Sequence, residues 1–331
     1  MNCILIVSHA RDEHAKHLIA KAKVAGLSPI LFDLTKFPSS AAITIEVSSV
    51  GGHEELVLKS RRTQISKEKL AGVWWRRPQG TFSRLKRTPL TEYVELESET
   101  VLRSLNHYFH QANWISDPEA TRLACRKPVQ LSVAREAGFR IPMTCITNSP
   151  CSVQAFIKQL GSKKLAIKPV GSSLVRFSKK NASDKNNKVI FTKAVNPDLI
   201  LKNLNLVGNC PVIYQEAIEK DSDIRVTVID NVVYAAEITI EGCADPDNLD
   251  WRNYGGTRVY RTHRLPDAVA QLCIDVTKKL GLRFGCIDLG FSHAEGYTFF
   301  EINPQGQWLP SEVRLGYDIS GALIRALSLT D

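Results

Sequence analysis

Three oxygen-bearing side chains near the C-terminus have types and spacing that suit a metal ion. Asp288 lies in the apolar run Cys-Ile-Asp-Leu-Gly-Phe, and Glu301 and Asn303 lie in the run Phe-Phe-Glu-Ile-Asn-Pro. The turn-prone residues Ser-His-Ala-Glu-Gly join the two runs, so the pattern predicts a β-hairpin with Asp288 beside Glu301 and with Asn303 on the same face as Glu301. Carboxylate and amide oxygens are the ligands that Mg²⁺ prefers, often shared with substrate phosphates. The pattern predicts a magnesium site, and the alternative is an amphipathic hairpin with two solvent-facing acids.

Two lysines are candidates for binding phosphate groups. Lys168 ends the apolar run Leu-Ala-Ile-Lys, and a small-residue turn containing Gly171, Ser172 and Ser173 follows it. An ammonium group and exposed backbone N–H groups suit a phosphate, but Lys168 alone is equally compatible with a surface lysine beside a β-turn. Lys127, in Cys-Arg-Lys-Pro, is a weaker candidate on its own. The chain contains neither the Walker motif nor a Gly-x-Gly-x-x-Gly fingerprint after its first strand.

A third candidate segment runs from a buried strand into a polar linker, with the sequence Pro-Val-Ile-Tyr-Gln-Glu-Ala-Ile. Such a strand edge can hold an adenine through the backbone groups of Glu216, Ala217 and Ile218. The side chain of Gln215 or Glu216 would add a further hydrogen bond.

Asp223 and Arg225 are spaced by two residues and would share one face of a strand. In a nucleotide site, Asp223 could accept from ribose hydroxyls and Arg225 could bind a phosphate or acyl oxygen. The alternative is an ordinary surface ion pair.

The elements that position these residues form three predicted units. Residues 1–115 open with a strand–helix–strand pattern and continue with further strands and a helical region over 91–111, which predicts an α/β domain. Asp117 followed by proline predicts a new helix start, and residues 116–212 then mix helices and strands as an α+β unit. Residues 213–331 hold several strands, an amphipathic helix over 266–280, the acidic hairpin and a last helix.

Composition bounds the class of protein. The 331 residues are 44% hydrophobic and 23% charged, which is ordinary for a folded soluble protein. No apolar run approaches the ~18 residues of a membrane span, and the N-terminus is predicted to be a buried strand rather than a signal peptide. The eight cysteines form no Cys-x-x-Cys pair, which favours reduced core thiols in a cytoplasmic protein over disulfides or zinc. The net charge of +9 predicts an anionic partner.

Together these pieces resemble the ATP-grasp superfamily over roughly residues 117–310. The family order is matched by Lys127, Lys168, Gln215, Glu216, Asp288, Glu301 and Asn303. The resemblance implies an ATP-grasp fold, mixed α/β and α+β, with an N-terminal pre-ATP-grasp domain and the nucleotide between the central and C-terminal domains. It also implies ATP and Mg²⁺ as cofactors. Lys127, Lys168 and the turn after Lys168 would bind phosphates, the 215–218 linker would bind adenine, and the hairpin would bind one or two magnesium ions.

Further motifs look like the microviridin-type graspetide synthetases, which are ATP-grasp maturases of ribosomal peptides. They are the Trp-Trp-Arg-Arg-Pro run starting at Trp74, the Asp-Trp-Arg run ending at Arg252, and the run from Glu301 to Trp308. By that resemblance the enzyme activates Asp or Glu side chains of a precursor peptide, with a leader and an acidic core, and closes ω-ester or ω-amide macrocycles. A homodimer is also expected. The alternative is structural: core tryptophans with one ring outward, and a solvated strand end at Arg76.

The chemistry of such a ligase accounts for the residue types. Phosphorylation turns a carboxylate into a better electrophile, and magnesium and cationic side chains screen the repulsion between the two anions. Arg252 and Arg225 are the candidates for contacting the activated carboxylate, because a planar guanidinium suits bidentate oxyanion binding. The polar segment 178–188 is expected to be a loop that covers the site.

Three rival interpretations remain at this stage. A glutamate ligase that modifies a protein C-terminus would share the ATP residues, and an inactive peptide-binding ATP-grasp protein would share the fold. Nucleic-acid binding is disfavoured because the basic runs around Arg62 and Arg87 are short and lack interleaved aromatic residues. No membrane partner is expected.

Overall fold

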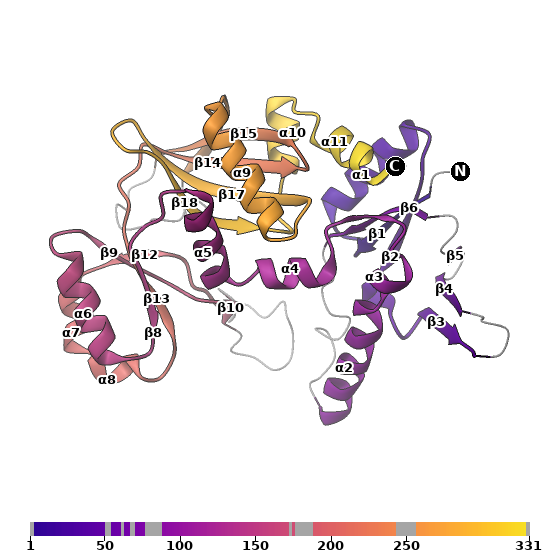
Figure 1. The fold of residues 1–331 in the computed structure, drawn as a ribbon, viewed down its shortest axis with the longest axis horizontal. Helices are drawn as coiled ribbons and strands as arrows, with labels where there is room; N and C mark the ends of the chain where they lie inside the picture. The colour runs from indigo at the N-terminus through magenta and orange to yellow at the C-terminus, as the bar shows by residue number, and fades with distance from the viewer. Residues whose placement is uncertain are drawn as a thin grey trace.

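Five β-sheets form among the described residues, and the three largest organise an N-terminal, a central and a C-terminal unit (Figure 1). The computed structural model describes residues 3–49, 54–60, 63–66, 70–76, 88–171, 174–175, 188–242 and 256–328. In Figure 1 the N-terminal unit lies at the right, the central unit at the left, and the C-terminal sheet above and between them. No described helix is long and apolar enough to cross a membrane.

The N-terminal unit is built on a parallel sheet whose order is β2-β1-β6-β7. Its strands are β1 (Cys3–Ser8), β2 (Ser28–Asp33), β6 (Leu70–Trp75) and β7 (Asn113–Ile115). All six residues of β1 are buried, as a parallel strand covered on both faces requires. Helix α1 (Glu13–Val24) begins at the N-cap Asp12, whose carboxylate accepts from the His14 N–H, and Gly26 follows it at φ +78°. The predicted strand–helix–strand opening is confirmed.

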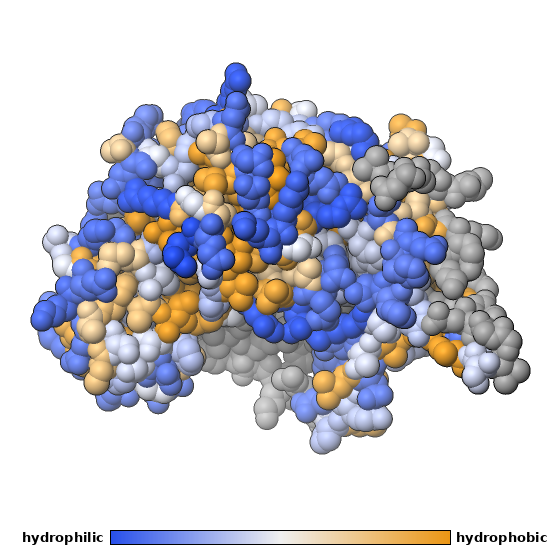
Figure 2. Space-filling model, in the orientation of Figure 1, coloured by the Kyte–Doolittle hydropathy of each residue, from blue (hydrophilic) through white to orange (hydrophobic). Residues whose placement is uncertain are grey.

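Smaller elements complete this unit. They are the 3₁₀ turn η1 (Leu34–Lys36), the antiparallel strands β3 (Ala41–Val47), β4 (Glu54–Ser60) and β5 (Thr63–Ser66), and the helices α2 (Pro89–Arg103) and α3 (Leu105–Tyr108). The predicted helical region over 91–111 is therefore two helices, which meet at Ser104. Figure 2 shows apolar surface at the protruding end of α2, where Leu90, Tyr93 and Leu96 are exposed.

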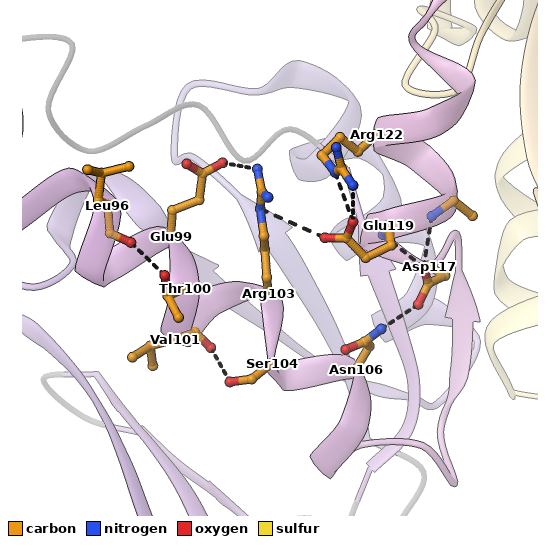
Figure 3. A network of polar contacts seen from close by, with 11 residues as sticks. Leu96, Glu99, Thr100, Val101, Arg103, Ser104, Asn106, Asp117, Glu119 and Arg122 are labelled. Atoms are coloured by element: carbon orange, nitrogen blue, oxygen red, sulfur yellow. Dashed lines mark hydrogen bonds and ion pairs between the residues drawn. The ribbon is translucent and has the colours of Figure 1, made fainter. Parts of the chain in front are cut away.

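Polar contacts fasten this unit to the chain that leaves it (Figure 3). Arg103 of α2 bonds Glu99 at 2.5 Å and lies 3.9 Å from Glu119. Asn106 donates to Asp117 at 2.6 Å, and Asp117 also accepts from two N–H groups at the start of α4 (Pro118–Ala124). The predicted cap at Asp117 is confirmed, and such a cap contributes about 1 kcal/mol.

The central unit is an antiparallel sheet of order β12-β9-β13-β8. Its strands are β8 (Thr144–Thr147), β9 (Leu165–Lys168), β12 (Lys193–Val195) and β13 (Val212–Glu216). Its helices are α6 (Pro150–Leu160), α7 (Pro197–Lys202) and α8 (Leu204–Val207), which share a core with the sheet. A two-stranded ribbon, β10 (Leu174–Val175) with β11 (Lys188–Val189), follows β9. Residues 178–187 of the expected covering loop lie outside the described residues.

The C-terminal sheet is antiparallel with the order β16-β15-β14-β17-β18. Its strands are β14 (Ser222–Ile229), β15 (Val232–Glu241), β16 (Thr257–His263), β17 (Phe284–Ser292) and β18 (Gly296–Asn303). Helices α5 (Lys127–Ala137) and α9 (Asp267–Lys279) pack on this sheet. Helix α5 falls within the predicted central unit 116–212, and its Leu131 and Ala134 bury their side chains in the C-terminal core.

The last helices return the chain to the N-terminal sheet. Helix α10 (Leu309–Leu315) precedes α11 (Ile319–Ser328), and α11 packs on α1, β6 and β7. The approach is close enough that a Cβ on Gly72 of β6 would collide with the Leu327 carbonyl. One core therefore joins residues of β1 and α1 to residues of the C-terminal segment.

Trp74 and Trp75 lie in different cores on opposite faces of β6. Trp74 packs with Trp308 and α11, and Trp75 packs near Trp114. Both rings are buried, so the alternative of one outward ring is wrong.

The cysteines confirm one expectation and correct another. The seven described cysteines are all free thiols, so no disulfide forms among the described residues. Cys3, Cys273 and Cys286 are buried as predicted for core thiols, but others are exposed on the surface. Burial raises the pKa of Cys273 to about 12, which keeps this thiol protonated and unreactive.

We expect iodoacetamide to alkylate Cys151 and Cys210 in the native protein while leaving Cys273 and Cys286 unmodified. The first two thiols are exposed, whereas the other two are buried and have raised pKa values. Mass spectrometry of tryptic peptides, before and after denaturation, measures this. Labelling of Cys286 as fast as Cys151 would contradict its packing.

Candidate active site

The predicted acidic hairpin is present. β17 and β18 pair in antiparallel register, with Asp288 opposite Glu301 and Cys286 opposite Asn303. The register shifts directly after Asp288, so Phe300 is an extra residue on β18. A β-bulge of this kind re-aims neighbouring side chains and is common beside active sites. The carboxylates of Asp288 and Glu301 therefore stand on adjacent strands at one level of the sheet.

Arg225 is the partner of Asp288. The two residues are opposite each other on β14 and β17, and Arg225 Nη1 donates to Asp288 Oδ1 at 2.6 Å. Both side chains are about one-tenth exposed. Burial alone would lower the pKa of Arg225, but Asp288, Cys286 and Glu301 together raise it above its usual value. The guanidinium is thus a permanent cation beside the two acids.

Asp223 and Arg225 do not form the surface ion pair that was the alternative to a nucleotide site. Asp223 is buried on the same strand face and bonds the ammonium group of Lys220. That ammonium group also lies 5.4 Å from the centre of the Phe300 ring. The two residues therefore belong to separate buried pairs along β14.

Lys127 joins the hairpin to the central sheet. Its Nζ donates to the carbonyl of Pro169 at 3.1 Å and lies 3.7 Å from Glu301 Oε2. Pro169 directly follows Lys168, whose side chain is buried at the end of β9. The structure thus brings both predicted phosphate lysines to the place where the central and C-terminal sheets meet.

The turn after Lys168 is described only in part. Gly171 is exposed, and a Cβ there would meet nothing within 4 Å, so packing does not require a glycine. Ser172 and Ser173 lie outside the described residues. Their assignment to phosphate stays a prediction.

Two side chains of the 215–218 linker, those of Gln215 and Glu216, bond to neighbouring segments and hold β13 in place. The Gln215 amide donates to Thr144 Oγ1 at 2.7 Å. The Glu216 carboxylate pairs with Lys163 Nζ at 2.7 Å and accepts from the Met143 N–H at 3.3 Å. Although burial opposes it, these bonds hold the pKa of Glu216 below its usual value.

Backbone N–H groups of the linker are also engaged. The Glu216 N–H donates to the Met143 carbonyl and the Ala217 N–H donates to the Lys164 carbonyl, each at 2.8 Å. The prediction that this segment binds adenine therefore depends on the other backbone groups of the linker, including those of Ile218.

Gln130 is a site residue that the sequence did not reveal. Its amide oxygen accepts from the Ile302 N–H at 3.2 Å and its amide nitrogen donates to the Ile302 carbonyl at 2.8 Å. Ile302 lies between the candidate ligands Glu301 and Asn303, so this buried amide fixes the outer edge of β18 where these candidate ligands stand. The sequence signal that could have identified Gln130 is its position on α5, three residues after Lys127.

Arg76, which belongs to the Trp-Trp-Arg-Arg-Pro run, also supports the site. The alternative of a solvated strand end is wrong, because Arg76 is 1% exposed. Its guanidinium donates to the carbonyls of Gln305 and Gly306 and lies 3.4 Å from Asp12 Oδ2. The carboxyl end of β6 thus supports the loop that leaves the hairpin. Arg77 and Arg252 lie outside the described residues.

We expect Arg76→Met to lower the free energy of unfolding by about 3–5 kcal/mol, because a buried acid loses its partner and two carbonyls lose a donor. Urea denaturation measures this. The matched control is Arg122→Met, which removes an exposed pair with Glu119 and should change stability by less than about 1 kcal/mol. Equal effects of the two substitutions would contradict the supporting role of Arg76.

The donor set fits magnesium. Asp288 and Glu301 supply carboxylates, and Asn303 supplies an amide oxygen that already accepts from the Gln305 N–H at 2.9 Å. An amide oxygen has a second lone pair available for a metal. Among the described residues, no group of three or more His, Cys, Asp or Glu side chains is arranged to hold a metal ion. A hard cation completed by water and phosphate oxygens suits these ligands.

Comparison with known proteins adds two family matches. Residues 3–122 match the MvdD pre-ATP grasp domain, and residues 126–327 match the RimK-like ATP-grasp domain. No protein with curated annotation matches the sequence.

Solved structures share the fold over nearly the whole chain. Macrocyclase MdnC bound with precursor peptide MdnA from Microcystis aeruginosa MRC is 23% identical, with a TM-score of 0.82 and coverage of 98% of this chain and 99% of that chain. A Chryseobacterium gregarium RiPP-associated ATP-grasp ligase in complex with ADP and a leader and core peptide is 24% identical, with a TM-score of 0.84 and coverage of 99% and 96%. ATP-grasp ligase PsnB with minimal precursor, Mg and ADP is 22% identical, with a TM-score of 0.72 and coverage of 98% and 96%.

Proposed function

Because this chain belongs to the RimK-like ATP-grasp family, with an MvdD-type pre-ATP-grasp domain before it, we propose that it is an ATP-dependent ligase that macrocyclises a precursor peptide. It phosphorylates Asp or Glu side chains of the peptide. Hydroxyl or amine side chains of the same peptide then displace the phosphate and form ω-ester or ω-amide rings.

One observation carries this proposal: Arg225, Asp288, Glu301 and Lys127 converge where the central and C-terminal sheets meet. In this group each cation lies beside a carboxylate: Lys127 beside Glu301, and Arg225 beside Asp288. Two anions, a triphosphate and a carboxylate, can approach each other only where their charges are neutralised. This arrangement meets that requirement.

The residues have the following roles in the proposal. Lys127 and Lys168 bind ATP phosphates, and Arg225 orients the peptide carboxylate or the phosphoryl group passing to it. Asp288, Glu301 and Asn303 would hold magnesium, which when bound polarises the phosphoryl group and offsets its charge. Arg252 and Arg225 stay the proposed contacts of the activated carboxylate.

The reaction needs no covalent nucleophile from the protein. Cys286, the thiol next to Arg225, is buried, and burial raises its pKa despite the nearby guanidinium. A protonated, enclosed thiol is a poor nucleophile. The acyl phosphate is therefore attacked by the peptide's own hydroxyl or amine, whose proton leaves as phosphate departs.

Two observations support a peptide substrate. Three structures with this fold contain precursor peptides or leader and core peptides. The net charge of +9 also suits a carboxylate-rich partner. Cytoplasmic location and a homodimer stay predictions.

Mass spectrometry tests the proposal. The purified protein is incubated with MgATP and each small acidic peptide encoded next to its gene, and the peptide mass and released ADP are measured. Loss of one water per ADP formed is the expected result. Gain of a glutamyl residue when free glutamate is present would instead identify a glutamate ligase, and ADP formation without a change in peptide mass would overturn the proposal.

A further inference from the structure

A cavity of about 520 Å³ separates the N-terminal domain from the segment that follows the metal hairpin. One wall is the loop after β1 together with the start of α1, and the other wall is Gln307 together with helix α10. The lining includes Arg11, Asp12, Glu13, Leu309, Val313 and Arg314. We call this cavity the Arg11–Arg314 pocket.

The pocket shares one residue with the surroundings of the active site. Gln307 lines it, and the carbonyl of Gln307 accepts from Arg225 Nη2 at 3.4 Å. The pocket also lies at the carboxyl end of β1, whose neighbours β2 and β6 stand on opposite sides of it. Such a point of order reversal in a parallel sheet is where ligands preferentially bind. The pocket and the surroundings of Arg225 are thus only one residue, Gln307, apart.

The acids that line the pocket already have partners. Asp12 accepts from Ser8 Oγ at 2.8 Å and from the His14 N–H at 3.1 Å, and it lies beside Arg76. Although burial opposes it, these contacts lower the pKa of Asp12. Glu13 pairs with Lys16 at 2.8 Å. Neither carboxylate therefore leaves an unbalanced negative charge.

The positive charges of Arg11 and Arg314 are not offset in this way. Within the described part of the chain, neither Arg11 nor Arg314 has an acidic side chain within ion-pair distance. Arg314 is held in place, because its guanidinium lies 4.5 Å from the centre of the Tyr260 ring and donates to the Arg258 carbonyl at 3.4 Å. Each wall thus contributes one arginine to the lining of the pocket.

Apolar groups accompany these cations. Leu309 and Pro310 line the same wall, and Val313, also in the lining, is 68% exposed. An exposed valine beside guanidinium groups fits a peptide, which brings both methylene groups and carboxylates. A triphosphate is less suitable, because it would place no apolar surface against Val313, and the lysines proposed to bind it lie where the central and C-terminal sheets meet.

We propose that the Arg11–Arg314 pocket binds the acidic stretch of the peptide next to the side chain being activated. The inference rests on the proposed function, since it assumes an acidic peptide substrate. Arg11 and Arg314 pair with carboxylates on that stretch, and Leu309, Pro310 and Val313 contact its methylene groups. The pocket thereby selects a carboxylate that has acidic neighbours over an isolated one.

A binding experiment tests this without turnover. The probe is a fluorescein-labelled synthetic peptide that repeats Thr-Glu-Asp, and its partner repeats Thr-Gln-Asn, both measured by anisotropy with MgADP present. We expect the acidic probe to bind more tightly, and the double variant Arg11→Ser/Arg314→Ser to weaken it by about tenfold. Arg325→Ser, which removes another exposed arginine, should leave binding unchanged.

The outcomes separate the two proposals. Equal binding of the acidic and amide probes to the wild-type protein, or no effect of the double variant, would overturn the pocket assignment. Arginine-dependent binding without water loss from any peptide would overturn the macrocyclase assignment and leave the pocket standing. Both arginines are exposed, so we expect the double variant to fold. An unchanged affinity for ADP and an unchanged thermal midpoint would show this.

Discussion

Glu301→Gln is expected to slow ATP-dependent peptide modification by about 1,000-fold, which corresponds to about 4 kcal/mol of transition-state stabilisation. The substitution preserves shape but removes a negative charge from the proposed magnesium ligands. It also takes the acid away from Lys127, which lies 3.7 Å from Glu301. Initial rates of ADP release and of water loss from the peptide measure this effect over a series of magnesium concentrations.

Asp288→Asn should give a similar loss of rate together with a loss of stability. Asp288 is the buried partner of Arg225, so the asparagine leaves a cation without its counter-charge. We expect the free energy of unfolding to fall by about 3 kcal/mol, whereas Glu301→Gln should leave it nearly unchanged. The protein should still be folded, as circular dichroism would report.

The matched control lies on the same hairpin. Glu295→Gln removes an exposed carboxylate that pairs with Arg140 at the turn, away from the proposed ligands. Its rate should equal that of the wild-type enzyme. Wild-type turnover in both Glu301→Gln and Asp288→Asn would defeat the metal assignment.

Local pattern was enough to predict the hairpin. The two apolar runs around Asp288 and Glu301 and the turn between them specify a β-hairpin without reference to the rest of the chain. The bulge after Asp288 was not predictable, because it depends on how Phe300 is accommodated beside Lys220. Helix α1 and the cap at Asp117 were predictable in the same way as the hairpin, because their signals lie within a few residues.

Contacts between distant segments were missed. Arg76 and Gln130 hold the backbone near the proposed metal ligands through partners more than a hundred residues away. A sequence pattern carries no information about which loop an arginine will reach. It also could not show that α5 leaves the central unit for the C-terminal core, since an amphipathic helix fits either sheet.

The strand β16 was missed for a different reason. Its sequence Thr-Arg-Val-Tyr-Arg-Thr-His is polar and largely exposed, as an edge strand of a sheet often is. Its pairing with β15 is fixed by backbone hydrogen bonds, which depend little on side-chain type. Hydrophobic alternation therefore gives little indication of such a strand.

Gly306→Ala is expected to have the second large effect. A Cβ at this position would collide with the side chain of Cys286 and would lie 2.9 Å from Arg225 Nη2. The backbone of Gly306 cannot retreat easily, because its carbonyl is bonded to Arg76 at 2.8 Å. Arg225 would then be pushed from Asp288, so we expect stability to fall by about 1–3 kcal/mol and the modification rate to fall by about a hundredfold.

Two further variants make this prediction specific. Gly208→Ala is the control, since Gly208 has a helical φ of −61° and no atom within 4 Å of an added Cβ, so stability should be unchanged or rise by a few tenths of a kcal/mol. In a Cys286→Gly background the main obstacle is absent, and Gly306→Ala should cost less than it does alone. Urea denaturation of the four proteins in this double-mutant cycle measures the coupling. If the changes in the free energy of unfolding caused by the two substitutions simply add, Gly306 does not pack against Cys286. The steric explanation for the displacement of Arg225 would then fail as well.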